Sequence, residues 1–449
     1  MSFVSEFDSL DFQKREEILN DLTIRIDPGK YGQYVRALNS FVLIGDRPSR
    51  NIVTPFSYST NKLKLPRRVR SDLANSYAEF LITLRDKQLE VRKEALTILN
   101  RTGSCVLSLH CGFGKTVLAT NISCRIKLRT LVIVNKVVLL KQWEESIRKS
   151  CPGCKVCCML PSKKSISQDA DFYIANAVNI PKFYDTETGK TVLDSIGTVV
   201  VDECHLIMAE TLVQSLLHVT PRYLIGLSAT PYRSDSFDQL IDLYFGAERI
   251  VRKLYREHII YKVNSGFKPD VQQTGSGTLN WGAILDSQAR DESRNNLIVD
   301  IIDRDSSRTF LVLVKRVVQG ESLLQMLNDR NISCTSLLGG QQTFDRAARV
   351  LIGTIAKVGT GFDHDKLNGL ILAADVAEYF IQYLGRIFRT KDGVPVVYDI
   401  VDSNPVLQKH FNTRKEVYIE HGGKVRTYSP QTRIQESSPP AHRLLSKAK

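Results

Sequence analysis

The chain has 449 residues, enough for about two or three domains, and its 43% apolar and 24% charged residues are close to the averages of soluble globular proteins. This composition excludes disordered, collagen-like and coiled-coil proteins. Lysine and arginine exceed aspartate and glutamate by 13, and such an excess attracts a polyanion by charge and counterion release. Nucleic acid is therefore the first partner to test, although a merely basic surface would have the same balance.

The sequence predicts an intracellular protein. No apolar run approaches the roughly 20 residues of a membrane-spanning helix, and the opening segment is acidic and polar where a secretory signal would be basic and then apolar. Nine cysteines is an odd number, which argues against a disulfide framework. We expect a reducing compartment.

Residues 1–80 form a small accessory region in which no chemistry can be named. Short apolar stretches alternate there with turn residues and end in a basic patch, made of Lys62, Lys64, Arg67, Arg68 and Arg70. The patch could touch a phosphate backbone or be a solvated helix start, and the second interpretation is favoured.

A first α/β domain is expected over residues 81–263. Apolar β-branched runs alternate with helical-period segments, at 106–109, 130–134, 172–175, 198–201 and 223–227. Continuous Val/Ile/Leu runs bounded by turns are typical of a parallel sheet that is covered on both faces.

A second α/β domain is expected over residues 264–423. The glycine-rich stretch 265–282 resembles an interdomain connector. A second series of strand-like runs follows, at 309–314, 334–338, 349–354, 370–373 and 394–401. Residues 424–449 are rich in Lys, Arg, Ser and Pro and are predicted to be a disordered basic tail.

The first domain contains a phosphate-binding loop. Gly112, Gly114, Lys115 and Thr116 follow a predicted strand and open a predicted helix. Glycines let backbone N–H groups approach phosphate oxygens at a helix N-terminus. Lys115 would neutralise the β and γ phosphates, and Thr116 would offer a hydroxyl to Mg²⁺. Leu109 stands where the strict motif has glycine; a glycine-rich turn with an incidental lysine is the alternative.

Two adjacent carboxylates, Asp202 and Glu203, directly follow the strand-like run 198–201. They would lie at the carboxyl edge of a buried strand, where α/β sheets bind ligands. Mg²⁺ on Asp202 would relieve their repulsion, and Glu203 would accept a proton from the water that attacks the γ-phosphate. An acidic helix cap would explain Asp202 but not the whole set, so an ATPase is predicted.

Two other features have plainer interpretations. Cys151, Cys154, Cys157 and Cys158 include a CxxC spacing that could form half of a metal site. The remaining cysteines are isolated in the sequence, so structural thiols are favoured. Trp143 lies on a helical segment with apolar neighbours and is expected in the core rather than as a base-stacking platform.

In order along residues 84–402, the chain resembles the superfamily 2 helicases. It is most similar to the XPB type and to the compact helicases of large DNA viruses, including the poxvirus transcript-release helicase. Leu84-Arg85 with Gln88 looks like the element that reads adenine, Asp202-Glu203-Cys204-His205 like the DExH box, and Ser228-Ala229-Thr230 like the motif that couples the two domains.

Further motifs follow in the second domain. Gly359-Thr360-Gly361-Phe362-Asp363 looks like motif V, and Gln382 to Arg389 has the QxxGRxxR pattern of motif VI. The resemblance implies two tandem RecA-like domains that use ATP and Mg²⁺. The residues then fall into five groups: catalytic Lys115, Glu203, Arg386 and Arg389; ATP-binding Arg85, Gln88, Gly112, Gly114, Lys115, Thr116 and Gln382; coupling Ser228, Thr230, His205, Gly361 and Asp363; metal-binding Thr116 and Asp202; and nucleic-acid-binding Asn135, Lys136 and Thr360.

The function expected from the motifs is that of an ATP-dependent helicase or translocase with little sequence specificity. The family suggests DNA, 3′-to-5′ movement, and transcription, repair or replication machinery as the setting, while the motifs do not discriminate DNA from RNA. A viral product acting in infected cells or packaged in the virion is expected. Arg233-Ser234-Asp235 keeps only the outer residues of an Arg-Glu-Asp element found in XPB-type members. The alternative is an ATP-gated factor that clamps or translocates on DNA without unwinding it.

Overall fold

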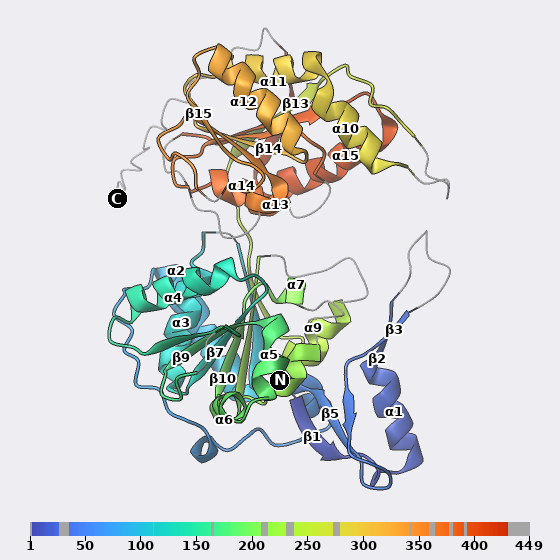
Figure 1. Ribbon diagram of the computed structural model, residues 1–449, viewed down its shortest axis with the longest axis vertical. Helices are drawn as coiled ribbons and strands as arrows, with labels where there is room; N and C mark the ends of the chain where they lie inside the picture. The colour runs from blue at the N-terminus through green and yellow to red at the C-terminus, as the bar shows by residue number, and fades with distance from the viewer. Residues whose placement is uncertain are drawn as a thin grey trace, which may run out of the picture. The chain divides into compact units, whose positions relative to one another are not determined.

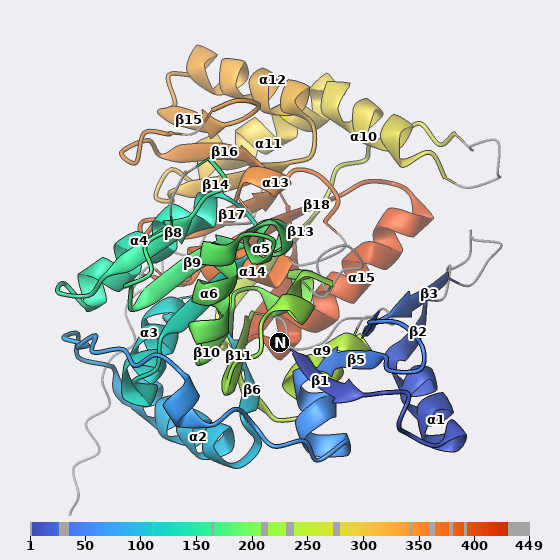
Figure 2. The same cartoon turned by 60° about the horizontal axis from the view of Figure 1, so that its bottom comes forward.

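A computed structural model describes residues 2–26, 36–110, 112–162, 166–207, 214–229, 238–272, 279–341, 343–358, 364–376, 380–389 and 393–429. The chain divides into two compact units, Met1–Arg252 and Lys253–Lys449, whose elements are labelled in Figures 1 and 2. Among the described residues, no helix has both the length and the apolar character needed to cross a membrane.

The first unit begins with a small β-rich region. Its elements are β1 (Ser2–Glu6), α1 (Phe12–Leu22), β2 (Thr23–Ile26), β3 (Arg36–Asn39), β4 (Val42–Ile44), β5 (Asn51–Pro55) and the one-turn helix η2 (Tyr58–Lys62). Strands β1, β5 and β4 form an antiparallel sheet, and β2 pairs with β3. A small core of its own, which includes Phe7, Ile18 and Leu22, holds this region together.

A seven-stranded sheet forms the centre of the first unit, in the order β12-β6-β11-β10-β7-β9-β8 with every neighbouring pair parallel. The strands are β6 (Ser104–Leu109), β7 (Thr130–Val134), β8 (Val156–Met159), β9 (Phe172–Asn176), β10 (Thr198–Val201), β11 (Tyr223–Ser228) and β12 (Arg249–Arg252). Five of them match the strand-like runs in the sequence. The predicted parallel α/β architecture is confirmed.

Helices cover both faces of this sheet. They are α2 (Asp86–Thr102), α3 (Lys115–Ile126), α4 (Val138–Ser150), α5 (Ile180–Tyr184), α6 (Glu187–Ser195), α7 (Cys204–Ile207) and α9 (Asp238–Phe245), with the short turns η3 (Arg70–Asp72), η4 (Ala177–Asn179) and η5 (Gln214–His218). Figure 1 shows α2, α3 and α4 on one side of the sheet and α5, α6 and α9 on the other. Alternate strand residues point to opposite faces, so Val199 and Val201 join one core cluster while Val200 joins the other.

The arginines of the basic patch at the end of the accessory region contact the protein backbone, whereas its Lys64 is exposed to solvent. Three of its arginines donate to backbone carbonyls in the last turns of α2, α3 and α6. The contacts are Arg67 Nη1 to Leu99 O (2.9 Å), Arg70 Nη2 to Ile126 O (2.8 Å) and Arg68 Nη1 to Asp194 O (2.8 Å). A cation at a helix C-terminus satisfies orphan carbonyls and opposes the negative end of the helix dipole. These three arginines therefore attach residues 67–70 to the helices that cover the seven-stranded sheet of the first unit.

The second unit contains another parallel sheet of seven strands, in the order β15-β16-β14-β17-β18-β13-β19. The strands are β13 (His258–Asn264), β14 (Phe310–Val314), β15 (Cys334–Leu337), β16 (Val350–Thr354), β17 (Gly369–Leu372), β18 (Val396–Val401) and β19 (Gly423–Thr427). Its helices are α10 (Trp281–Arg290), α11 (Glu292–Arg304), α12 (Val317–Asp329), α13 (Ile355–Val358), α14 (Phe380–Ile387) and α15 (Pro405–Glu420).

The second sheet is also buried on both faces. Residues of α11 and α12 pack with Phe310 and Val312, whereas residues of α14 pack with Leu311 and Leu313. A charged cluster lies between α15 and the sheet. Arg414 donates to both carboxylate oxygens of Asp399 (2.9 and 2.8 Å) and to Asp375 (2.7 Å), and all three side chains are buried.

Three segments differ from the organisation expected from the sequence. Strand β13 precedes the boundary expected at residue 263 but pairs with β18 and β19 in the second sheet. The described part of the stretch 265–282 lies within the second unit rather than between units. The tail expected to be disordered from residue 424 contributes most of β19, while residues 430–449 lie outside the described residues. A short apolar alternation predicts a strand, but its partner strand depends on the tertiary fold.

Candidate active site

The loop between β6 and α3 contains two glycines with left-handed backbone, Gly112 (φ 81°) and Gly114 (φ 90°). Residues with a Cβ rarely adopt this conformation. Gly114 is the N-cap of α3 and offers no side chain to the first N–H groups of the helix. The loop therefore presents backbone donors and the positive end of a helix dipole to an anion.

Lys115 is the first residue of α3, and its ammonium group lies inside the loop. Its Nζ donates to the carbonyl of Leu109 at 3.3 Å and lies 4.0 Å from Glu203 Oε1. Thr116 follows in the first turn and is partly buried. Lys115 and Glu203, which are 88 positions apart in the sequence, therefore lie close together at the ends of two different strands.

Asp202 and Glu203 follow β10 at the carboxyl edge of the sheet. Asp202 Oδ1 accepts a hydrogen bond from the backbone N–H of Glu203 (3.0 Å). Burial, followed by the charge of Glu203, raises the pKa of Asp202 to about 6. A bound cation would favour the ionised form and so counteract both effects.

Glu203 itself is held in an uncommon conformation, with φ at 45°. Positive φ in a residue with a side chain is a form of strain that concentrates at functional sites. Its Oε2 atom is buried, accepts no hydrogen bond within the described part of the chain, and lies 3.6 Å from His205 Nδ1. This oxygen is suited to accept a proton from a ligand.

His205 joins the carboxylates to the neighbouring strand. It is fully buried on α7, and its Nδ1 shares a hydrogen bond of 2.9 Å with Ser228 Oγ, at the end of β11. Lys115, Glu203, His205 and Ser228 therefore form a chain of polar contacts across the ends of three strands. Thr230, the other predicted coupling residue of this unit, lies outside the described residues.

Trp143 is buried in the core as predicted, with 3% of its surface exposed. It also has a polar contact that the sequence did not reveal: its indole Nε1 donates to Asp202 Oδ2 at 2.8 Å. This bond lowers the pKa of Asp202 and orients its carboxylate. No local pattern marks the pairing, because 59 positions separate the two residues.

Arg85 and Gln88, expected to contact adenine, both reach the phosphate-binding loop. Gln88 Nε2 donates to the carbonyl of Phe113 at 2.8 Å, and the Arg85 guanidinium donates to the carbonyls of Phe113 and Gly112. A Cβ on Gly114 would lie 2.5 Å from Gln88 Nε2. Both side chains therefore brace the loop from the start of α2.

The predicted nucleic-acid residues of the first unit follow β7. Asn135 is partly buried and Lys136 is exposed. The next two residues, Val137 and Val138, are also exposed at the start of α4. Thr360, the nucleic-acid-binding residue predicted in the second unit, lies outside the described residues. The same is true of Gly361, Asp363 and residues 233–235.

In the second unit, Gln382 and Arg386 lie four residues apart on α14, and Arg389 follows the helix. Residues spaced by three or four share a helix face. Arg386 is mostly buried, with 8% of its surface exposed. The Tyr383 hydroxyl donates to the carbonyl of Ile355 (3.0 Å), and burial raises the pKa of Tyr383 to about 12. The helix that carries Gln382 and Arg386 is thus anchored by Tyr383 on its buried side.

The first-unit residues suit ATP and Mg²⁺. Carboxylate and hydroxyl oxygens are the ligands that Mg²⁺ prefers, and Asp202 and Thr116 supply them. The raised pKa of Asp202 and the buried Glu203 oxygen, which has no hydrogen-bond partner among the described residues, are both features that a cation and a polar ligand would relieve. We infer that Gly112, Gly114 and Lys115 suit the phosphates.

Cys124, Cys151 and Cys154 lie close together in the first unit as free thiols. Cys124 on α3, isolated in the sequence, lies with its Sγ 3.6 Å from Cys151 Sγ. Burial and neighbouring thiols raise the pKa of Cys151 to about 12, with hydrogen bonding to Cys124 as the largest cause. Within the described ranges, no group of three or more His, Cys, Asp or Glu side chains could hold a metal ion.

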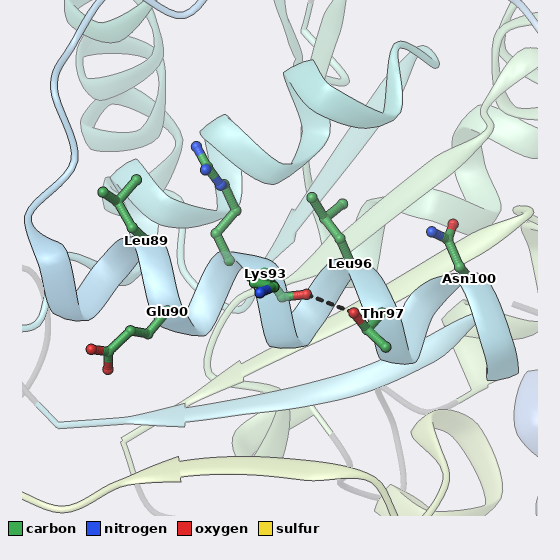
Figure 3. A pocket seen from close by; sticks show the side chains of 7 residues that line it. Leu89, Glu90, Lys93, Leu96, Thr97 and Asn100 are labelled. Carbon is green, nitrogen blue, oxygen red and sulfur yellow. Dashed lines mark hydrogen bonds between the residues drawn. The ribbon is translucent and has the colours of Figure 1, made fainter.

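A surface hollow lies away from these residues, along the outward face of α2 (Figure 3). Its lining residues are Leu89, Glu90, Arg92, Lys93, Leu96, Thr97 and Asn100. The buried face of the same helix carries other residues, among them Val91, Ala95 and Leu99. The hollow is therefore separate from the phosphate-binding loop.

Residues 81–233 match a protein-family model described as "Type III restriction enzyme, res subunit". The chain is 46% identical over 400 residues to "Putative helicase 161L" of Invertebrate iridescent virus 6, covering 83% of this chain and 89% of that protein. It is 32% identical over 369 residues to "Putative helicase 055L" of Frog virus 3, covering 80% and 83%.

A solved structure of Saccharomyces cerevisiae Dbp5 bound to RNA and ADP BeF3 superposes with a TM-score of 0.52 over 77% of this chain and 94% of that chain. The sequences are 14% identical, so this similarity concerns the fold alone. Together with the two parallel seven-stranded sheets, this similarity confirms the predicted fold of two tandem RecA-like α/β domains.

Proposed function

The chain belongs to the superfamily 2 helicases, in the group found in large DNA viruses, and we propose that it is an ATP-driven motor that moves 3′-to-5′ along DNA. The observation that carries the proposal is the chain of contacts from Lys115 through Glu203 and His205 to Ser228. These contacts connect the proposed phosphate-binding lysine and the proposed proton acceptor to the end of strand β11, where Ser228 lies. Binding the phosphates and positioning the attacking water are two of the parts that phosphoryl transfer requires.

In the proposed reaction, the loop glycines and Lys115 hold the β and γ phosphates and offset their charge. Glu203 orients the attacking water and accepts its proton on Oε2, the buried oxygen for which the described part of the chain offers no hydrogen bond. Asp202 and Thr116 would hold Mg²⁺, which when bound neutralises charge on the phosphates. Trp143 keeps the Asp202 carboxylate in one orientation.

Release of the γ-phosphate removes the group that Glu203 faces in the proposed cycle. Because His205 contacts both Glu203 and Ser228, a shift of the Glu203 carboxylate alters the hydrogen bond to Ser228 at the end of β11. In the proposed cycle, Arg386 and Arg389 of the second unit stabilise the charge that develops on the transferred phosphoryl group. If the affinity of each α/β unit for a nucleic-acid strand rises and falls during the ATP cycle, the two units bind in alternation and the protein moves stepwise along that strand. The excess of 13 basic residues suits a polyanionic track.

The test is the ATPase rate of wild type and Glu203→Gln, with and without single-stranded DNA, duplex DNA and RNA. We expect nucleic acid to stimulate the wild type, and DNA to stimulate it more than RNA. The Gln variant should lose about 10²- to 10⁴-fold in turnover, the typical contribution of a general base, and should still bind ATP. Glu145→Gln makes the same change of charge at an exposed position of α4 and should behave as wild type.

Two outcomes would contradict the proposal: a basal rate that no nucleic acid changes, or full turnover in Glu203→Gln. Strand displacement on a tailed duplex separates a helicase from the alternative, an ATP-gated clamp or translocase, since only the helicase releases the complementary strand. Raising the salt concentration should weaken stimulation steeply because phosphate contacts depend on counterion release.

A further inference from the structure

An exposed aromatic stack lies on the second unit. Trp281, the first residue of α10, has 37% of its surface exposed, and its ring stacks on that of His410 from α15. The ring centroids are 5.5 Å apart and the planes differ by 18°. One face of the indole is therefore covered by a parallel ring while part of the side chain remains open to solvent.

The ring beneath Trp281 is held by a buried network. His410 Nδ1 lies 2.6 Å from Asp375 Oδ2, and Asp375 also accepts from Arg414 (2.7 Å). Arg414 is fixed in turn by its double contact with Asp399. Because His410 Nδ1 is bonded to a carboxylate that Arg414 holds in turn, the imidazole is fixed relative to the sheet, and so is the indole stacked on it.

The other side of α10 is tied down as well. Asn280 caps the helix through its side chain, which accepts from the N–H of Ala283 (3.2 Å). Arg316 Nε donates to Asp286 Oδ1 at 2.7 Å, and its Nη2 lies 3.4 Å from the carbonyl of Gly282, next to Trp281. The guanidinium remains partly exposed, so a cation and an open indole lie close to one helix start.

These residues gather at one edge of the second sheet. Arg316 follows β14 and Asp375 follows β17, and the carboxyl ends of parallel strands meet at the same edge. That edge is where α/β proteins bind ligands. Single-stranded nucleic acid is recognised by this combination of a stacking aromatic ring and a nearby cation.

We propose that Trp281 is a stacking platform for a base of single-stranded nucleic acid, with His410 as its supporting ring and Arg316 as an adjacent phosphate contact. This inference rests on the proposed function and adds a binding residue that none of the recognised sequence motifs contains. Stacking is tolerant of base identity, in keeping with a motor that must pass over any sequence.

Equilibrium binding of a fluorescein-labelled single-stranded DNA oligonucleotide to the full-length protein tests the proposal. Trp281→Ala should weaken binding by about 5- to 150-fold, the range reported for loss of one stacked base. Trp281→Phe keeps an aromatic face and should recover most of the affinity. Tyr77→Ala removes another exposed aromatic side chain, 85% exposed on the first unit, and should bind as wild type. The ATPase rate without DNA should be the same in all four proteins.

A second oligonucleotide, with the same backbone but no bases, separates stacking from a structural role. Wild type should bind the abasic strand more weakly, and Trp281→Ala should lose nothing further on it. The chain has two tryptophans, and Trp143 is buried, so quenching of emission by the base-bearing strand reports Trp281. The quenching should be absent with the abasic strand and in Trp281→Phe.

The outcomes are distinguishable. If wild type binds DNA and its ATPase is stimulated, but Trp281→Ala binds equally well, the platform is refuted while the proposed function stands. If Trp281→Ala loses the same factor on both strands, the residue acts on structure, and the platform is again refuted. If wild type binds no nucleic acid, both proposals fail together.

Discussion

Replacing Trp143 with phenylalanine should weaken the response of the enzyme to Mg²⁺. The substitution keeps an aromatic ring on α4 but removes the N–H that donates to Asp202 Oδ2 at 2.8 Å. This bond lowers the pKa of Asp202, which burial and Glu203 raise to about 6. Without it, the pKa rises further, and protons compete more strongly with the cation for the carboxylate.

The magnitude follows from the kind of bond lost. A hydrogen bond to a charged group contributes about 1.5–3 kcal/mol, and each 1.4 kcal/mol is a factor of ten in an equilibrium constant. Because only the ionised carboxylate binds the cation, the loss acts through the fraction of Asp202 that is ionised, and we expect the Mg²⁺ concentration that gives half-maximal ATPase activity at pH 7 to rise by about 2- to 15-fold. Turnover at saturating Mg²⁺ should remain, because Lys115 and Glu203 are unchanged.

The assay is a Mg²⁺ titration of ATPase activity at fixed ATP, with the thermal shift produced by Mg²⁺ and ADP as an independent readout. Ile147→Val is the matched control: Ile147 is buried on the same helix, and the change costs about 0.5–1.5 kcal/mol of stability without touching Asp202. An unchanged Mg²⁺ dependence in Trp143→Phe would refute the reasoning. So would an equal shift in the control, because packing alone would then explain it.

Two further predictions concern stability. Arg414→Met leaves the buried carboxylates of Asp399 and Asp375 without their shared cation, so the free energy of unfolding measured by urea denaturation should fall by about 3–5 kcal/mol. The control Lys415→Met, at an exposed neighbouring position, should change it by less than about 0.5 kcal/mol. Equal effects of the two substitutions would contradict the role of the network. Arg67→Met removes a cation from the C-terminus of α2, so unfolding should become easier by about 1–2 kcal/mol. The salt dependence of DNA binding should stay the same in Arg67→Met, and a shallower dependence would show that Arg67 contacts phosphate after all.

The sequence by itself determined most strands of the two large sheets, though not β8, β12, β13 or β19, and it gave the local pattern of the predicted phosphate-binding loop. Runs such as 130–134 and 198–201 are apolar and β-branched throughout, and a strand buried on both faces needs nothing else to be recognised. Gly112, Gly114 and Lys115 are likewise consecutive or nearly so, and their chemistry follows from local spacing. Asp202 and Glu203 could be placed at a strand end for the same reason.

Only the tertiary structure decided which distant side chains meet. Trp143 donates to Asp202, Arg67 caps α2, and Trp281 stacks on His410, each pair being separated by dozens of positions in the chain. The same holds for β13, which the expected boundary at residue 263 assigned mostly to the first domain but which pairs with strands of the second sheet. Periodicity is a property of neighbours along the chain, so it predicts elements. Contacts between elements depend on how those elements pack. Packing therefore determines the orientation of the Asp202 carboxylate and the stacking of Trp281 on His410.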